Sequence, residues 1–184
     1  MSTTLRLINK RIAFFLDEGF EDLEFWVTVM RLREEGAKVV GGRVRRIVGA
    51  KANHPLKGKN GLSATSEAAA SGISPDDFEA TVVPGGWAPD KLRRYPEVTG
   101  FVRKMYEQKK IVGLICHAGL VGISAGIVRG HKATGSQGIK DDLVNAGAIW
   151  VDEPAFRDGN IVWGRVVDDI PDFCRELVRA IEAD

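Results

Sequence analysis

The sequence predicts an α/β protein with three layers, in which helices cover both faces of a mostly parallel central sheet. Short apolar runs of strand length recur along the chain, and helix-like patterns separate them. The runs are continuously apolar, which is typical of strands buried on both faces of a parallel sheet. Regular alternation of strand and helix favours the same architecture. The 184 residues, 44% of them apolar, are enough to enclose one hydrophobic core.

The first elements form a β-α-β pattern. A strand is expected at residues 11–16, and a helix follows at residues 20–35, which Gly36 ends. Residues 37–40 are then expected to form the second strand. Four apolar residues fall on one stripe of the helix, which we expect to face the core: Phe20, Leu23, Val27 and Met30.

The stretch from residue 41 to residue 77 is the least regular. Residues 43–48 have the composition of a short strand. The Asn-Gly turn signal within residues 58–61 predicts a small hairpin. Residues 73–77 have the pattern of a helix start that leads into a further strand.

The alternation resumes in the second half of the chain. Strands are expected at residues 80–83, 110–116, 148–151 and 160–164, the last two pairing around a turn at 158–160. Helices are expected at residues 95–108, 119–128, 141–146 and 170–183. Neither a repeat nor a linker interrupts the chain. Residues 1–184 are therefore expected to form one domain, with residues 1–10 as a loosely ordered extension.

The charge is nearly balanced, with 26 basic and 25 acidic residues. This argues against a nucleic-acid-binding protein, because phosphate neutralisation needs a basic surplus. A basic run within residues 43–59 has no interleaved aromatic residues and is interpreted as a solvated loop or a subunit-contact surface. No segment reaches the length of a membrane helix, and the N-terminus has no apolar signal core.

The two cysteines, Cys116 and Cys174, are too few for a secreted disulfide scaffold, so the protein is expected in the cytoplasm. The three histidines do not show metal-ligand spacing. Neither a metal nor another cofactor is expected.

Candidate site residues follow three predicted strands. They lie at residues 17–24, at residues 84–90, and at Cys116 and His117. In open α/β sheets, sites gather beyond the carboxyl ends of the strands. The fold prediction therefore brings these distant segments to one edge.

Cys116 lies where a buried strand turns into a helix. A thiol at a helix N-terminus loses its proton more easily, and a sharp strand-to-helix turn exposes the side chain. The alternative is a buried structural cysteine, and position alone does not separate the two. Cys174, on the apolar face of the last helix, is expected in the core.

The carboxylates of the first helix also allow two interpretations. Glu24 lies at the edge of the apolar stripe, where a partly buried carboxyl would have a raised pKa and could donate a hydrogen bond to a thiolate. Alternatively, Glu24 and the acidic residues around it only complement the helix dipole. Gly85 and Gly86 could present amides to an oxyanion or form only a tight turn.

These residues together resemble the ThiJ/PfpI family, in its PfpI intracellular-protease-like branch within the class I glutamine-amidotransferase-like superfamily. The similarity runs in order from Arg11 to the end of the chain. It rests on GFEDLE (19–24), PGGWAPDKLR (84–93), ICHAG (115–119), ISAG (123–126), GIKDDLVNAGAIWVDE (138–153) and DDIPDFCREL (168–177).

The resemblance implies a flavodoxin-like α/β/α sandwich with Cys116 as nucleophile and His117 as its acid–base partner. Glu24 matches a buried glutamate that contacts the cysteine. Asp90 matches an acidic residue that reaches the histidine of a neighbouring subunit, so self-association into at least a dimer is expected. Glu21 matches a further pocket carboxylate, and Gly85 and Gly86 match the oxyanion-hole turn. Where relatives often carry a Tyr or His, this chain has Ser136.

The resemblance therefore implies a stress-related, cysteine-dependent hydrolase that acts on a carbonyl compound, such as a peptide, a glycated adduct or a methylglyoxal-like molecule. The competing hypothesis is a non-enzymatic stress protein, which senses oxidants through Cys116 or holds unfolded chains.

Overall fold

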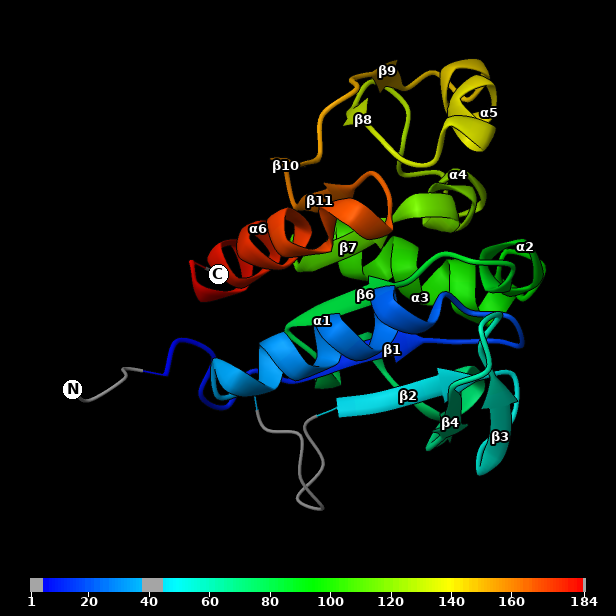
Figure 1. Ribbon diagram of the computed structural model, residues 1–184, viewed down its shortest axis with the longest axis vertical. Coiled ribbons are helices and arrows are strands. Elements are labelled where there is room, and N and C mark those ends of the chain that lie inside the picture. Colours follow the sequence, from blue (N-terminus) through cyan, green and yellow to red (C-terminus); the bar gives the residue numbers. More distant parts are fainter. Residues whose placement is uncertain (1–4, 38–44, 184) are drawn as a thin grey trace.

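A computed structural model describes residues 5–37 and 45–183 (Figure 1). Its main sheet has seven strands in the order β10-β11-β7-β6-β1-β2-β5. All neighbours are parallel except the antiparallel pair β10 and β11. The strands are β1 (Ile12–Phe15), β2 (Arg45–Gly49), β5 (Ala68–Ala69), β6 (Ala80–Val83), β7 (Ile111–Ile115), β10 (Ala155–Asp158) and β11 (Ile161–Gly164).

Helices cover both faces of this sheet, which confirms the predicted three layers. Helices α1 (Asp22–Glu34) and α6 (Ile170–Glu182) pack side by side on one face. Helices α3 (Pro96–Glu107) and α4 (Gly119–Ala125) cover the other, with the short α2 (Ala88–Leu92) beside α4 (Figure 1). The core between the layers contains fully buried side chains from every layer, the largest being Trp163.

Two smaller units lie outside the main sheet. The antiparallel hairpin of β3 (His54–Lys57) and β4 (Ser63–Ser66) confirms the turn predicted at residues 58–61. Strands β8 (Lys132–Ala133) and β9 (Ile149–Trp150) pair in parallel and flank α5 (Lys140–Asn145). The predicted pairing of residues 148–151 with residues 160–164 is therefore wrong. β11 instead joins the main sheet between β7 and β10, where both of its edges are hydrogen-bonded.

The predicted core face of the first helix is also wrong. Leu23, Val27 and Met30 are 46%, 39% and 59% exposed, whereas Phe20 is buried ahead of the helix. The helix packs instead through a set that begins at Phe25 and recurs every three to four residues: Phe25, Thr28, Val29 and Leu32. Glu21 and Glu24 lie at the N-terminal end of this buried face. With these two carboxylates buried, the helix presents the apolar stripe to solvent.

Most of the remaining predictions agree in type with the structure and differ by a few residues at their ends, whereas β6 has the predicted limits and the helix start at residues 73–77 is a 3₁₀ turn. The strand expected at residues 37–40 lies outside the described residues, except for Ala37. Short 3₁₀ turns occur at Pro75–Asp77 and Cys116–Ala118. In the expected N-terminal extension, Leu7 is fully buried, and Arg6 donates a hydrogen bond of 3.0 Å to Glu182 at the end of α6. In the part of the chain that the structure describes, no helix is long and apolar enough to cross a membrane.

Candidate active site

Cys116 occupies a strained turn between β7 and α4. The strand is buried along its whole length, and the chain then makes one 3₁₀ turn before α4 begins. Cys116 has φ +60°, which a residue with a Cβ rarely adopts. Such strain is retained where the surrounding structure fixes it, and in nucleophile elbows it exposes the reactive side chain. Cys174, by contrast, is buried in α6 as predicted, with its Sγ 3.6 Å from Thr28 Oγ1.

Glu24 from α1 reaches the same point as Cys116. Its side chain is fully buried, and its Oε2 accepts a 2.6 Å hydrogen bond from the Gly85 N–H. No side chain fits at Gly85: an added Cβ would lie 2.7 Å from Cys116 Cβ and 2.8 Å from Glu24 Oε2. Glycine at position 85 is therefore what lets the carboxyl and the thiol meet.

Burial shapes the ionisation of both groups. It raises the pKa of Glu24 to about 7, against the lowering effect of the Gly85 N–H. Burial also raises the pKa of Cys116, and with the charge of the Glu24 carboxylate and its hydrogen bond with the thiol the pKa reaches about 12. A lowered thiol pKa was expected from the helix N-terminus, but α4 is only seven residues long and starts after the 3₁₀ turn. The raised pKa of Glu24 agrees with expectation.

His117 contacts the sulfur directly. Its Nδ1 lies 3.2 Å from Cys116 Sγ. Burial lowers the pKa of His117, and the nearby Lys59 ammonium lowers it further. A neutral imidazole at this distance can accept the thiol proton.

Two backbone N–H groups also face the sulfur, those of Gly86 and His117, and each lowers the thiol pKa by hydrogen bonding. This corrects one expectation: Gly85 does not offer its N–H to an oxyanion, because Glu24 already accepts it. Gly86 has φ +77°, and an added Cβ would lie 2.4 Å from Gly19 O. The turn therefore requires glycine there.

The two other carboxylates at the start of α1 hold the hairpin. Glu21 caps the helix by accepting from the Glu24 N–H, and it also accepts from Asn60 Nδ2 at 3.0 Å. Asp22 accepts from the N–H groups of Asn60 and Leu62 at 2.8 and 2.7 Å. Both carboxylates are buried. Glu21 thus has a supporting position beside the site and does not line the cavity.

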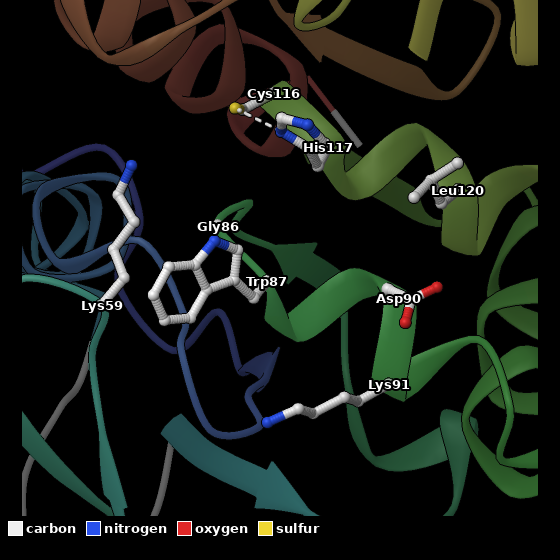
Figure 2. A pocket seen from close by; sticks show the side chains of 8 residues that line it. All are labelled: Lys59, Gly86, Trp87, Asp90, Lys91, Cys116, His117 and Leu120. Carbon is white, nitrogen blue, oxygen red and sulfur yellow. Dashed lines mark hydrogen bonds between the residues drawn. The ribbon is translucent and has the colours of Figure 1, made fainter. Parts of the chain in front are cut away.

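A cavity of about 370 Å³ opens at the sulfur. In Figure 2 the Trp87 indole, one of the lining side chains, lies near the middle of the view. Cys116 and His117 lie above it, and the side chain of Lys59 lies beside it (Figure 2). Gly86, Asp90, Lys91 and Leu120 complete the lining. Asp90 lies in the cavity wall of its own chain, where its carboxylate is paired with Arg94 on the same segment. Among the described residues no bond joins it to His117, and the expected contact with the histidine of a neighbouring subunit stays a prediction.

Sequence patterns did not indicate Lys59 or Lys91 as site residues. Lys59 belongs to the hairpin tip, which the bonds of Glu21 and Asp22 and the backbone bond from Lys59 N–H to Phe20 O hold at the cavity. Within residues 5–37 and 45–183, no group of three or more potential ligand side chains could hold a metal ion.

The sequence matches the DJ-1/PfpI family over residues 10–180. The chain belongs to this family. It is 37% identical over 172 residues to a deglycase of Pyrococcus abyssi, which covers 94% of this chain and 99% of the relative. It is 36% identical over 172 residues to the deglycase PfpI of Pyrococcus furiosus, with the same coverage.

A solved two-domain protein of Anabaena variabilis, with DJ-1/ThiJ/PfpI-like and ferritin-like domains, superposes with a TM-score of 0.86 at 34% identity. The match covers 92% of this chain and 47% of that protein, so the chain spans about half of its length. Solved DJ-1 structures share the three-layer arrangement, and the fold is flavodoxin-like.

Proposed function

We propose that this protein is a cysteine-dependent hydrolase of the PfpI type that acts on a carbonyl compound. The observation that carries the proposal is the strained Cys116, which lines the cavity with His117, whose Nδ1 lies 3.2 Å from the sulfur, and has the buried Glu24 carboxyl behind it. Relatives named deglycases support activity of this kind. A peptide bond, a glycated adduct and a methylglyoxal-like molecule all offer the electrophilic carbon that such a thiol attacks.

The chemistry follows from the geometry. The thiol gives its proton to His117 as Sγ bonds to the carbonyl carbon, and the carbonyl electron pair moves to the oxygen. The N–H groups of Gly86 and His117 stabilise that oxygen. With a peptide bond, collapse of the adduct expels the amine, which takes the proton from His117. Methylglyoxal has no leaving group: its alkoxide takes that proton, and the resulting hemithioacetal then moves its C1 hydrogen to C2 as a proton, with His117 as base, to give the lactate thioester. In both cases water hydrolyses the thioester with His117 as base. Cys116 is regenerated.

The proposal includes self-association, with Asp90 contributed across the interface to orient the histidine of the partner. The Asp90 side chain is 57% exposed, and the neighbouring Trp87 is 66% exposed. A partner subunit can therefore reach Asp90 from solvent. The cytoplasmic location expected from the two cysteines stays a prediction, as does a role in stress.

Turnover tests the proposal. The purified protein is assayed with methylglyoxal, by lactate formation, and with peptide substrates, beside Cys116→Ala and the matched control Cys174→Ala. We expect activity in the wild type and in the control and its loss, by at least about a hundredfold, in Cys116→Ala. Full activity of Cys116→Ala contradicts the proposal. No turnover, together with selective oxidation of Cys116 by dilute peroxide, favours the oxidant-sensing alternative.

A further inference from the structure

A second cavity, of about 300 Å³, adjoins the one that contains Cys116. The two have Lys59, Trp87 and Lys91 in common, so these three side chains stand between them. The second cavity is also lined by Glu18, Gly19, Lys57 and Gly58. A molecule that reacts at Cys116 can therefore extend past Trp87 into a second space.

The charge around this second space is mainly positive. Lys57, Lys59 and Lys91 line it, and Glu18 is its one acidic lining residue. The Glu18 carboxylate accepts from the Lys57 N–H at 3.2 Å. Asp90, in the first cavity, is already paired with Arg94. The lysines therefore outnumber the acidic side chains that could neutralise them.

The ammonium groups retain free hydrogen-bonding capacity. Lys91 Nζ donates to the Glu18 carbonyl oxygen at 3.1 Å, which uses one of its three donors. Lys59 Nζ lies 4.0 Å from Glu21 Oε1, at the limit of an ion pair, and its side chain is 33% exposed. Among the described residues, no carboxylate lies within ion-pair distance of the Lys57 or Lys91 ammonium.

Trp87 gives this region a rigid apolar surface. Its side chain packs on Gly19, where an added Cβ would lie 2.7 Å from Trp87 Cε3. The rest of the indole is open, at 66% exposure for the residue. In Figure 2 the ring lies between the side chain of Lys59 and α2, which carries Lys91. A substrate whose short carbon chain lies across the indole would reach from the sulfur to the lysines.

We propose that the carbonyl substrate carries an oxyanion group, a carboxylate or a phosphate, which the positive charges of Lys59 and Lys91, on the two sides of Trp87 (Figure 2), attract while its carbon chain crosses the indole. This inference rests on the proposed function, because it assumes that a substrate reacts at Cys116. Lysine ammonium groups beside an apolar surface bind such anions and raise the local concentration of a charged reactant. Neutral carbonyl compounds would lack this contact and bind less well.

The test uses two reagents of similar shape and different charge, N-ethylmaleimide and N-(2-carboxyethyl)maleimide. The rate constant for labelling of Cys116 by each reagent is measured by peptide mass. The rate constant for the anionic reagent is divided by that for the neutral one, and this ratio is divided by the same ratio measured with β-mercaptoethanol, which corrects for intrinsic reactivity. We expect the normalised ratio to favour the anionic reagent by about tenfold in the wild type and to fall as salt is added. Lys59→Gln and Lys91→Gln should each lower it, and the double variant should bring it near one. Lys104→Gln, an exposed change on α3, is the matched control and should leave the ratio unchanged.

Protection distinguishes the two anions. Inorganic phosphate and succinate, at equal ionic strength with chloride as reference, are tested for slowing of N-ethylmaleimide labelling in the wild type and in the double variant. Protection by one anion that the double variant loses identifies the group that is bound. A normalised ratio of one in the wild type, or a preference that the lysine variants do not change, overturns the inference. Labelling does not require turnover, so this result is separate from failure of the proposed hydrolase activity.

Discussion

Two proton-binding side chains meet at the reactive sulfur. With the pKa of Glu24 near 7 and that of Cys116 near 12, the pair loses its protons in two separated steps. Between them the pair retains one proton, which either the thiol or the carboxyl can hold. When the carboxyl holds it, the sulfur is a thiolate that accepts a hydrogen bond, and it is ready to attack.

We therefore expect the labelling of Cys116 by iodoacetamide to rise in two steps, the first near pH 7 and the second near pH 12. Glu24→Gln removes one of the two proton-binding groups and should give a single step. Labelling against pH, with peptides resolved by mass, provides the measurement, and the buried Cys174 is the internal control that stays slow. A single step shared by the wild type and the variant would exclude a proton shared by Cys116 and Glu24.

Glu24 also makes stability depend on pH. Its pKa is raised from 4.5 to about 7 in the folded protein. Between these values the folded state binds more protons than the unfolded state, so the free energy of unfolding falls as pH rises, by about 3 kcal/mol for a shift of this size. Glu24→Gln can still accept from the Gly85 N–H and carries no charge.

Above pH 7, Glu24→Gln should therefore unfold with a free energy about 3 kcal/mol higher than the wild type. Below pH 4.5 the two proteins should be alike, because wild-type Glu24 is then protonated in both states. Urea unfolding at both pH values measures the difference. A variant less stable than the wild type above pH 7 contradicts this linkage.

The positions of site residues at strand ends were predictable from the sequence, whereas the positions of the residues around them in the cavity were not. Cys116 follows a fully apolar strand and precedes a helix, so its place at the sheet edge follows from the fold. Glu24 could be identified as a candidate from its spacing on the helix. Lys59 gave no local signal, because hydrogen bonds to residues distant in the sequence, among them Glu21 and Asp22, bring the hairpin tip to the cavity.

Among the elements, the β3–β4 hairpin receives two of its tip contacts from one buried side chain. The Asp22 carboxylate accepts from two N–H groups at the hairpin tip, and Gly58 allows the tip to approach, since an added Cβ there would lie 2.4 Å from Asp22 Oδ1. Loss of that carboxylate would leave both N–H groups without their partner.

Asp22→Ala should lower the free energy of unfolding by about 1–3 kcal/mol and reduce the labelling preference for the anionic maleimide, since Lys59 loses its fixed place. Asp22→Asn, which can still accept one of the bonds, should have a smaller effect on both. Urea unfolding and the maleimide ratio measure the two outcomes. An Asp22→Ala variant with unchanged stability would show that the hairpin is held by other contacts.

Element types were easier to predict than the faces they bury. Parallel strands are recognisable because they are apolar throughout, and β6 has the predicted limits. The orientation of α1 was not predictable, because two apolar stripes compete on that helix. Burial of Glu21, Asp22 and Glu24 decides between them, and hydrophobic spacing alone assigns such carboxylates to the solvent side. The β9 and β11 pairings failed for a related reason, since a short strand finds its partner through the tertiary fold.

At the scale of the whole molecule, the proposed role of Asp90 requires a second subunit. Light scattering should then give a mass of at least a dimer of the 20.1 kDa chain. Mixing separately inactive Cys116→Ala and Asp90→Ala subunits tests the arrangement more sharply. If Asp90 acts across the interface, re-associated dimers should recover about a quarter of wild-type turnover, because half are mixed and each mixed dimer has one intact site.

Two results would contradict cross-subunit action. One is a monomer with full turnover, and the other is a mixture that stays inactive although mixed dimers have formed. Asp90→Ala should leave the iodoacetamide labelling of Cys116 unchanged, because the structure shows no contact between Asp90 and the sulfur within one chain. This control separates a lost partner residue from a damaged cavity.

The division of the cavity between sheet and hairpin bears on how this protein can evolve. The attacking sulfur, its proton acceptor and its amide donors come from β6, β7 and the turns after them, whereas Lys57 and Lys59 come from a hairpin outside the main sheet. Substitutions in the hairpin can change which molecules are bound without replacing an acid–base group, and only those at Lys59 also change the pKa of His117. Natural selection, or a library confined to residues 57–62 that retains Gly58 and the tip N–H groups, can therefore explore new substrates on an unchanged reaction.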